Sequence, residues 1–561
     1  MSIAEKILVK LAQRQYKNTD EFFSYMRSQF SDFDMAPLRK ATLISAYRQL
    51  LANKKIRRNI HLEAMLRKGA VRTLSGVTVI TVLTKPYACP GKCVFCPTEP
   101  NMPKSYLSNE PAAQRAVRLR FDPFDQVQKR IKALEVNGHD VDKIEIIVLG
   151  GTWSAYPTRY QNWFIRQIYY AANTYTPSAL PLNKGEKARG ISRGSAEGVA
   201  KRRRPKTLAA EQKINETAKY KIIGLTLETR SDHVTEDEIK HLRELGCTRV
   251  QLGVQHTDNE ILKLNRRGEY VEDDIRATEL LKRAGFKVDH HYMPDLPGST
   301  PDKDRAMFRR VFEGDDLQPD QLKIYPCVVN EYAQLYHWYK AGKYKPYKEA
   351  DLLQLLRDIK KMTPPYVRIN RLIRDIPEES IIAGNDVTNL RQYLQGQLKK
   401  EGTPCKCIRC REVRADTADI SKVVLKKRTY RASHGTEHFL SYESPDETMI
   451  YAFLRLRFSD PPSRKATVDK FRKHFLPELT DAALVRELHV YGLMIPVEKS
   501  GRPKAARAQH IGFGKRLMAE AEKMSREADF KKVAVISGIG VRNYYKKLGY
   551  RLEGTYMTKT L

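Results

Sequence analysis

The stretch TVITVLTKPYACPGKCVFC, residues 78–96, joins an apolar strand pattern to three closely spaced cysteines. Cys89, Cys93 and Cys96 follow the strand directly, with the spacing CxxxCxxC. Three such thiolates can ligate three irons of a 4Fe–4S cluster and leave the fourth iron open for another ligand. A zinc site is the alternative, but structural zinc prefers four protein ligands. The spacing therefore favours an iron–sulfur cluster in the loop that follows a strand.

Downstream of this loop, to about residue 335, short apolar stretches alternate with helical patterns. Six stretches are predicted strands: 78–84, 144–150, 222–228, 249–255, 286–293 and 322–326. Nearly continuous apolar strands separated by helices indicate a parallel sheet covered by helices. Six repeats fit a partial (β/α)6 barrel, whose active site lies at the carboxyl ends of the strands. A Gly-, Ser-, Lys- and Arg-rich segment, 183–206, interrupts this rhythm and is predicted to be an exposed loop.

A different pattern begins at about residue 426, where antiparallel-looking strands precede a helix and another strand. The segment QHIGFGKRL, 509–517, places Gln509, Gly512 and Gly514 just before that helix. Glycines allow close approach, and the free N–H groups of a helix N-terminus can hold a pyrophosphate. The turn resembles the Q-x-x-G-x-G turn of the GCN-type N-acetyltransferase fold.

The chain of 561 residues is strongly basic, with 100 Lys+Arg against 66 Asp+Glu and a formal net charge of +34. Such an excess favours a nucleic-acid partner. An anionic membrane surface is the rival, but no basic amphipathic helix with an aromatic face stands out. No apolar run is long enough to span a membrane, and the N-terminus has no signal-peptide pattern, so we expect a cytoplasmic protein without membrane association.

Residues 1–75 show apolar positions at helical spacing and carry many basic side chains. These are Arg39, Lys40, Lys54, Lys55, Arg57, Arg58, Arg67 and Lys68. A solvated helix face is one reading of this density, and a surface that contacts phosphates is the other. We predict a basic helical region that binds tRNA.

The cysteine motif resembles the signature of the radical S-adenosylmethionine (SAM) superfamily. In that superfamily a glycine-rich turn after the second strand contacts the methionine amino group of SAM. Gly150, Gly151 and Thr152 occupy this place here. A plain tight turn would also explain two adjacent glycines.

The two halves, in this order, resemble the family of the Elongator catalytic subunit in its stand-alone prokaryotic form. The resemblance covers nearly the whole chain from about residue 76, and includes the blocks VDKIEIIVLGGTW, GCTRVQLGVQ, HYMPDLPG, LVRELHVYG and VISGIGVRNYYKKLGYRLEG. It implies carboxymethylation at C5 of the wobble uridine in the tRNA anticodon stem-loop. Acetyl-CoA would supply the carbon unit and SAM a 5′-deoxyadenosyl radical, with an electron donor for the cluster.

Family acetyl-CoA contacts carry over to particular residues of this chain. They fall on Lys143, Glu487, Leu488, His489, Val490, Phe513, Gly514, Lys515 and Tyr545. Tyr544 and Tyr545 are the candidates for a tyrosine beside the thioester, with ordinary packing aromatics as the alternative. Eukaryotic members space the first two cluster cysteines more widely, which changes the loop but not the number of ligands.

Cys405, Cys407 and Cys410 lie between the two catalytic halves, in a region that can carry zinc in this family. A fourth ligand is required, for which Cys327, His434 or water would each serve. Reduced surface thiols are the alternative. We predict a structural zinc site that fixes the two halves relative to each other.

The predicted protein is an α/β multidomain chain. Its parts are a basic helical region at 1–75, a radical SAM partial barrel at 76–400, a cysteine-rich linker at 401–425 and an acetyltransferase-like α/β domain at 426–561. A protein lysine acetyltransferase with a vestigial iron–sulfur site is the first rival, although a polycationic enzyme would repel lysine-rich substrates. A non-catalytic RNA-binding scaffold is the second, although both sets of ligands are present.

Overall fold

The computed structural model describes most of the chain. The described residues are 3–14, 16, 19–28, 40–67, 76–177, 203–387, 389–413, 422–459, 474–491 and 512–561. Gln509 and most of the predicted loop at 183–206 lie outside them.

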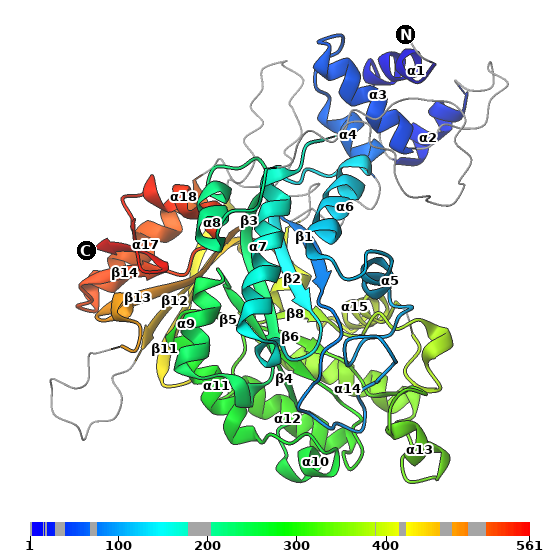
Figure 1. Ribbon diagram of the computed structural model, residues 1–561, viewed down its shortest axis with the longest axis vertical. Helices are drawn as coiled ribbons and strands as arrows, with labels where there is room; N and C mark the ends of the chain where they lie inside the picture. Colours follow the sequence, from blue (N-terminus) through cyan, green and yellow to red (C-terminus); the bar gives the residue numbers. More distant parts are fainter. Residues whose placement is uncertain are drawn as a thin grey trace.

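Four N-terminal helices pack around a small core of their own, at the top of Figure 1. They are α1 (Ile3–Ala12), α2 (Thr19–Ser28), α3 (Lys40–Ala52) and α4 (Ile60–Leu66). Leu8, Phe22 and Leu50 are completely buried there. Arg67, just after α4, donates a hydrogen bond to the carbonyl of Gly138 at 3.2 Å, which ties these helices to the body.

Within the described residues, the first large sheet has seven parallel strands in the order β1-β2-β3-β4-β5-β6-β8. The strands are β1 (Thr78–Leu83), β2 (Lys143–Leu149), β3 (Lys221–Thr229), β4 (Arg249–Gln255), β5 (Lys287–Tyr292), β6 (Gln321–Ile324) and β8 (Arg368–Arg371). The six predicted strands are confirmed. The seventh, β8, extends the half-barrel by one strand and was not predicted.

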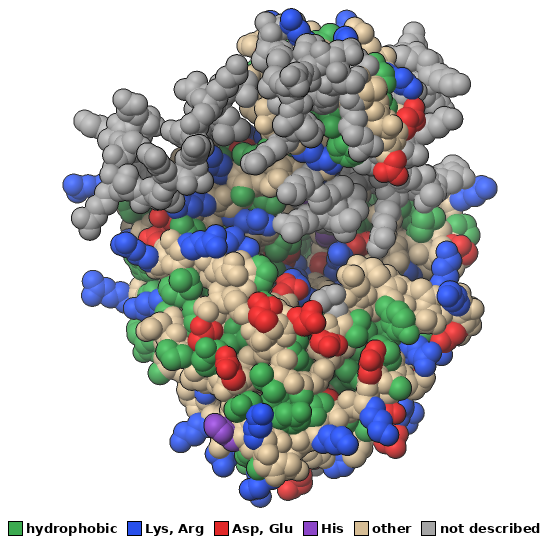
Figure 2. Space-filling model, turned by 90° about the vertical axis from the view of Figure 1, so that its right-hand side faces the viewer, with side chains coloured by type: hydrophobic (Ala, Val, Ile, Leu, Met, Phe, Trp, Pro, Cys, Tyr) green, Lys and Arg blue, Asp and Glu red, His purple; other side chains and the backbone are tan. Residues whose placement is uncertain are grey.

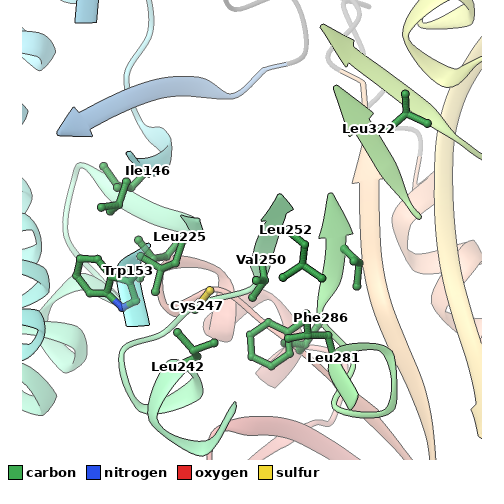
Figure 3. Close-up of a cluster of buried hydrophobic side chains, with 14 of the residues drawn as sticks. Ile146, Trp153, Leu225, Leu242, Cys247, Val250, Leu252, Leu281, Phe286 and Leu322 are labelled. Atoms are coloured by element: carbon green, nitrogen blue, oxygen red, sulfur yellow. The ribbon is translucent and has the colours of Figure 1, made fainter. Parts of the chain in front are cut away.

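Helices follow the strands of this sheet, and most of them cover its outer face (Figure 1). They are α5 (Pro111–Arg118), α6 (Pro123–Val136), α7 (Thr158–Thr174), α8 (Leu208–Asn215), α9 (Glu236–Glu244), α10 (Asn259–Leu264), α11 (Val271–Arg283), α12 (Pro301–Glu313), α13 (Leu335–Lys340), α14 (Glu349–Met362), α15 (Leu390–Lys400) and α16 (Ile408–Arg411). A small ladder, β7 (Val328–Val329) with β9 (Ala383–Gly384), lies beside them. Figure 3 shows part of the core under these helices, where Cys247 packs among apolar side chains as a completely buried thiol.

The C-terminal half forms a second sheet, whose described strands have the order β10-β11-β12-β13-β14-β16-β15. They are β10 (Val424–Arg431), β11 (Gly435–Glu443), β12 (Ile450–Ser459), β13 (Ala482–Val490), β14 (Lys532–Val535), β15 (Arg551–Glu553) and β16 (Tyr556–Thr560). The helices of this half are α17 (Phe513–Glu527) and α18 (Arg542–Lys546). Only β13 and β14 pair in parallel among these strands, and the other pairs are antiparallel. This agrees with the predicted acetyltransferase-like α/β fold.

The two halves meet in one hydrophobic cluster, and the C-terminal sheet has a second cluster of its own. Leu484, Ile536 and Tyr556 from the C-terminal sheet belong to the same buried cluster as the strands and helices of the half-barrel. A buried ionic group also crosses the boundary, because Arg486 of β13 donates to the Asp320 carboxylate at 2.8 Å and to the carbonyl of Phe286 at 2.6 Å. The two halves therefore pack as one body.

Candidate active site

The cysteine loop follows β1 at the carboxyl edge of the half-barrel, which is where the fold places active sites. Cys93 is buried, and Cys89 and Cys96 are half-buried. An ideal Cβ on Gly91 would lie 3.6 Å from the sulfurs of both Cys89 and Cys93, so the missing side chain keeps the space between them open. Gly91 thus lies between the sulfurs of Cys89 and Cys93, and Cys96 is hydrogen-bonded to Cys93.

Two arginines set the electrostatics of this loop. Arg267 donates to the Cys93 sulfur at 3.6 Å, and Arg230 lies next to the loop. A hydrogen bond with Cys96, together with these positive charges, lowers the pKa of the Cys93 thiol to about 5. A thiolate is the form that binds iron, so Cys93 suits the cluster predicted from the spacing, whereas the hydrogen bond with Cys93 and burial raise the pKa of Cys96.

The turn after β2 touches this loop. The Thr152 hydroxyl lies 3.5 Å from the Cys89 sulfur. Gly150 has a φ of 150°, and a Cβ on it would come within 1.7 Å of the Thr84 hydroxyl oxygen, so the turn requires glycine there. The structure therefore brings Gly150, Gly151 and Thr152 to the cysteine loop, as expected for a turn that would contact a ligand bound there.

An apolar cavity opens beside the third cysteine. Its walls include Phe95 and Pro97 of the cysteine loop, Met293 after β5, Tyr325 after β6 and Arg374 after β8. These strand ends converge with the cysteine loop, so the cavity belongs to the same mouth of the half-barrel.

A second cradle lies in the C-terminal sheet, where two parallel strands diverge. β13 pairs with β14 only as far as Val485, whereas β13 itself continues to Val490. The Glu487 carboxylate is held by Arg455 at 3.0 Å and Lys287 at 3.7 Å, so this side chain already has partners. Beyond Val485, β14 no longer pairs with β13. On that side the backbone N–H and C=O groups of residues 486–490 can bind an extended ligand.

The N-terminus of α17 faces this opening. Gly512, with a φ of 83°, precedes the helix, and its first turn carries Phe513, Gly514 and the exposed Lys515. A Cβ on Gly514 would lie 2.8 Å from the Tyr544 hydroxyl and 3.5 Å from a methyl of Val490. The unsatisfied N–H groups of this turn are the feature that binds phosphates at helix starts.

The remaining predicted residues of this cradle differ in setting. Burial raises the pKa of Tyr544, so its hydroxyl stays protonated over the glycine turn. Tyr545 is 6% exposed and packs in the C-terminal core against Tyr550. His489 stacks on Phe453, and burial lowers its pKa to about 4.

Lys143 is the first residue of β2, at the opposite end of the strand from the cysteine loop. Its neighbour in the sheet is Lys221, whose Cβ would lie 2.7 Å from a Cβ on Gly540 of the C-terminal half. Lys143 is thus on the side of the half-barrel that meets the acetyltransferase-like sheet.

The second cysteine group is compact. The sulfurs of Cys405, Cys407 and Cys410 lie within 4.8 Å of one another, which suits a single metal ion. Cys410 also accepts hydrogen bonds from Gln395 at 3.1 Å and Lys360 at 3.7 Å. The proposed fourth ligands are elsewhere, since Cys327 belongs to the cluster around Cys93 and His434 lies 4.0 Å from Glu279.

Sequence reasoning missed a set of polar side chains that fill the interior of the half-barrel. They form a hydrogen-bonded group made of Gln251, Asp289, Gln321, Lys323 and Asn370. Gln251, Asp289 and Lys323 sit inside predicted strands, where a polar residue is their only signal. Gln321 directly precedes a predicted strand, and Asn370 lies in β8, which was not predicted.

Comparisons with known proteins agree with this geometry. Residues 84–311 match the model of the radical SAM superfamily, and residues 319–400 match that of the Radical_SAM C-terminal domain. The tRNA uridine(34) acetyltransferase of Methanocaldococcus infernus is 42% identical over 89% of this chain and 88% of its own length. The chain belongs to this family.

Two further relatives extend the family. Elongator complex protein 3 of Bos taurus is 37% identical over 88% of this chain and 86% of its own length. The solved structure of Methanocaldococcus infernus Elp3 with an N-terminal deletion has a TM-score of 0.70 and 39% identity, covering 87% of this chain and all of that one. The predicted resemblance to the Elongator catalytic subunit family, the radical SAM half-barrel and the acyltransferase class of enzyme are thereby confirmed.

Family membership implies a 4Fe–4S cluster and SAM, and the cysteine loop has the donors for the cluster.

Basic side chains are exposed after α3, at Lys54, Lys55, Arg57 and Arg58, although Arg58 pairs with Glu63 at 2.9 Å. Arg39 and Lys68 lie outside the described residues. Figure 2 shows Lys and Arg side chains along the flanks of the molecule and Asp and Glu nearer the middle of that face. None of the described helices has the length and apolarity needed to cross a membrane.

Proposed function

We propose that this protein carboxymethylates C5 of the wobble uridine of tRNA, with acetyl-CoA as the carbon source and SAM as the oxidant. The observation that carries the proposal is the presence of two cradles, the cysteine loop and the described part of the β13–α17 opening, in one body with a shared core. The names of the relatives, tRNA uridine(34) acetyltransferase and Elongator complex protein 3, support the substrate.

The overall reaction balances without an added oxidant. One acetyl C–H bond and the uridine C5–H bond are replaced by a new C–C bond, which releases two electrons and two protons. SAM takes up both electrons and one proton and ends as methionine and 5′-deoxyadenosine, the other proton goes to solvent, and water releases coenzyme A. When a cluster is bound at Cys89, Cys93 and Cys96, it supplies the electron that cleaves SAM, and an external donor reduces it first.

The protein's own groups hold the reactants. Arg267 keeps Cys93 in its thiolate form, and the turn at Gly150–Thr152 lies where the methionine end of SAM would bind. At the other cradle, the first turn of α17 would receive the pyrophosphate of acetyl-CoA, while the backbone of 486–490 holds its pantetheine arm. The protonated Tyr544 hydroxyl would donate to the thioester, and Lys143 would contact acetyl-CoA from the half-barrel side.

The decisive experiment supplies anaerobically reconstituted protein with tRNA, SAM and acetyl-CoA labelled in its acetyl methyl. We expect labelled 5-carboxymethyluridine by nucleoside mass spectrometry, and its loss in Cys93→Ala together with lost iron. Cys247→Ala is the matched control, because this thiol is buried in the core away from the loop. Label in lysine peptides instead of uridine would favour a protein acetyltransferase and overturn the proposal.

We further propose that Cys405, Cys407 and Cys410 hold one zinc ion with water as the fourth ligand. The compact sulfur triangle supports this, and water is the candidate left by the positions of Cys327 and His434. Elemental analysis should find about one zinc per chain, lost in Cys407→Ala and kept in Cys247→Ala. Full zinc content in Cys407→Ala would contradict the site.

A further inference from the structure

The inward face of β5 carries two polar side chains below the mouth of the half-barrel. Asp289 and His291 are two residues apart on the strand and so share one face, and Met293 follows at the same spacing. Met293 lines the cavity beside Phe95 of the cysteine loop. Asp289 and His291 therefore lie deeper in the half-barrel than the cysteine loop, along a line that leads to it.

Both side chains have a buried polar atom without a partner. Asp289 is completely buried and His291 is 6% exposed. Asp289 Oδ1 and His291 Nε2 have no hydrogen-bond partner among the described residues. Buried polar atoms in native proteins are nearly always hydrogen-bonded, so two such atoms on one inward face indicate a missing polar ligand.

The surrounding groups fix these atoms in place. Asp289 Oδ2 accepts hydrogen bonds from Asn370 at 3.0 Å and Gln251 at 3.2 Å, which orients the carboxyl group and leaves Oδ1 to a ligand. His291 packs edge-on against Tyr325, with ring centroids 5.8 Å apart. The site is thus rigid before a ligand enters.

A cation completes the set. Lys323 of β6 is the sheet neighbour of His291, and its ammonium donates to Gln251 Oε1 at 2.9 Å. An ammonium group carries three N–H donors, so Lys323 can also donate to a carbonyl oxygen of a ligand. The ligand that fits has a donor facing Asp289 and an acceptor facing Lys323. A second acceptor faces His291 in the tautomer that carries the ring proton on Nε2, with Nδ1 3.9 Å from the Glu228 carboxylate.

We propose that Asp289, His291 and Lys323 bind the Watson–Crick edge of an extruded uracil. Uracil presents a carbonyl, an N3–H and a second carbonyl along this edge. Asp289 Oδ1 accepts from N3–H, Lys323 donates to one carbonyl and His291 faces the other. This assignment rests on the proposed function and names the residues that position its substrate base, as in other enzymes that flip a nucleotide into a pocket.

The same groups would reject cytosine. Cytosine has an acceptor at N3 and a donor at N4, so its N3 lone pair would face the Asp289 carboxylate. A site built to hydrogen-bond one pattern strongly disfavours the analogue that leaves its buried groups unpaired. The set therefore gives base specificity as well as position.

The test compares two tRNA transcripts that differ only in having U or C at position 34. In Asp289→Asn the amide oxygen would stay with the donors Asn370 and Gln251, so the amide N–H2 would replace the acceptor Oδ1. We expect U34 modification to fall about 100-fold and the U34:C34 ratio of kcat/KM to fall at least about tenfold. Asp295→Asn is the matched control, since Asp295 is also buried with an unpartnered Oδ1 but lies in the loop after β5 and is not part of the hydrogen-bonded group around Asp289. An unchanged ratio in Asp289→Asn would overturn the assignment.

Two further measurements separate the alternatives. If the three groups instead read the adenine of SAM, Asp289→Asn would weaken SAM binding in equilibrium dialysis by the same factor, without tRNA present, and this would refute the assignment to uracil. Lys323→Met tests the site through its donor, and is expected to lower U34 modification while SAM binding and iron content stay at the wild-type level. A wild-type enzyme that leaves U34 unmodified would refute the proposed function itself, whereas an active wild type with unchanged variants refutes only this site.

Discussion

At the scale of single residues, Lys282 is the clearest case of a buried charge that destabilises the folded state. It is completely buried, and its ammonium lies 3.9 Å from the carboxylates of both Asp320 and Glu437 without a hydrogen bond. Burial lowers the pKa of Lys282 to about 8, below the value of about 10.4 expected in the unfolded chain. Between these two values the unfolded state binds more protons than the folded state, so stability from this group rises with pH.

Lys282→Met removes that titration. At pH 7 we expect the variant to be as stable as the wild type or more so, because no hydrogen bond is lost. From pH 8 to pH 10 the free energy of unfolding of the wild type should gain roughly 2 kcal/mol on the variant. Urea titrations across this range measure the difference, with the exposed Lys240→Met as control. A difference that stays constant with pH would contradict the prediction.

Site residues were predictable from the sequence where the chemistry fixes their spacing along the chain. They were not predictable where only the fold brings them together. Cys89, Cys93 and Cys96 are close in the chain, so their shared loop was predictable. Asp289 and Lys323 come together only because β5 and β6 pair, and an unpartnered atom is visible only once its neighbours are placed.

At the scale of elements, the start of α17 is the most sensitive. A Cβ on Gly514 would displace the Tyr544 hydroxyl, since the two atoms would lie 2.8 Å apart. Gly514→Ala should therefore weaken acetyl-CoA binding about tenfold, equivalent to about 1.4 kcal/mol, while the helix itself persists. Isothermal titration calorimetry measures the affinity, and Gly396→Ala in α15 is the control because its Cβ meets nothing within 4 Å. Equal affinities in the two variants would count against this cradle.

The strands were predictable to the extent that they are apolar. β1 to β3 read as near-continuous apolar runs, whereas β4 to β6 alternate apolar side chains with polar ones that face the interior. β8 has the sequence RINR, in which Ile369 is the one buried side chain, so no pattern distinguishes it from a loop. Its place at the sheet edge is set by pairing with β6 instead.

At the scale of the whole molecule, the contact between the halves is made partly by backbone. A Cβ on Gly538 would lie 1.9 Å from the carbonyl oxygen of Ile223 in β3, so the turn before α18 packs directly on that strand. Gly538→Ala must push the sheets apart, and overpacking of this kind typically costs about 1–3 kcal/mol or more.

We expect Gly538→Ala to lower the midpoint of thermal unfolding by several degrees, whereas Gly396→Ala leaves it unchanged or raises it. In calorimetry the two sheets of the wild type should unfold in one transition, because they share a core. Two resolved transitions assigned to the separate sheets would disprove this coupling. The shared core itself was not predictable, because the strand patterns in the sequence show where each element lies but not which faces of the two sheets pack together.

The shared core also bears on what a shortened gene could encode. A chain ending near residue 425 would lack Leu484, Ile536 and Tyr556, and would leave the apolar wall that they cover open to water. Each fragment expressed alone should aggregate, and the two should recover solubility when produced together and allowed to reassemble. We therefore expect deletion of either half to abolish the activity of the other half as well.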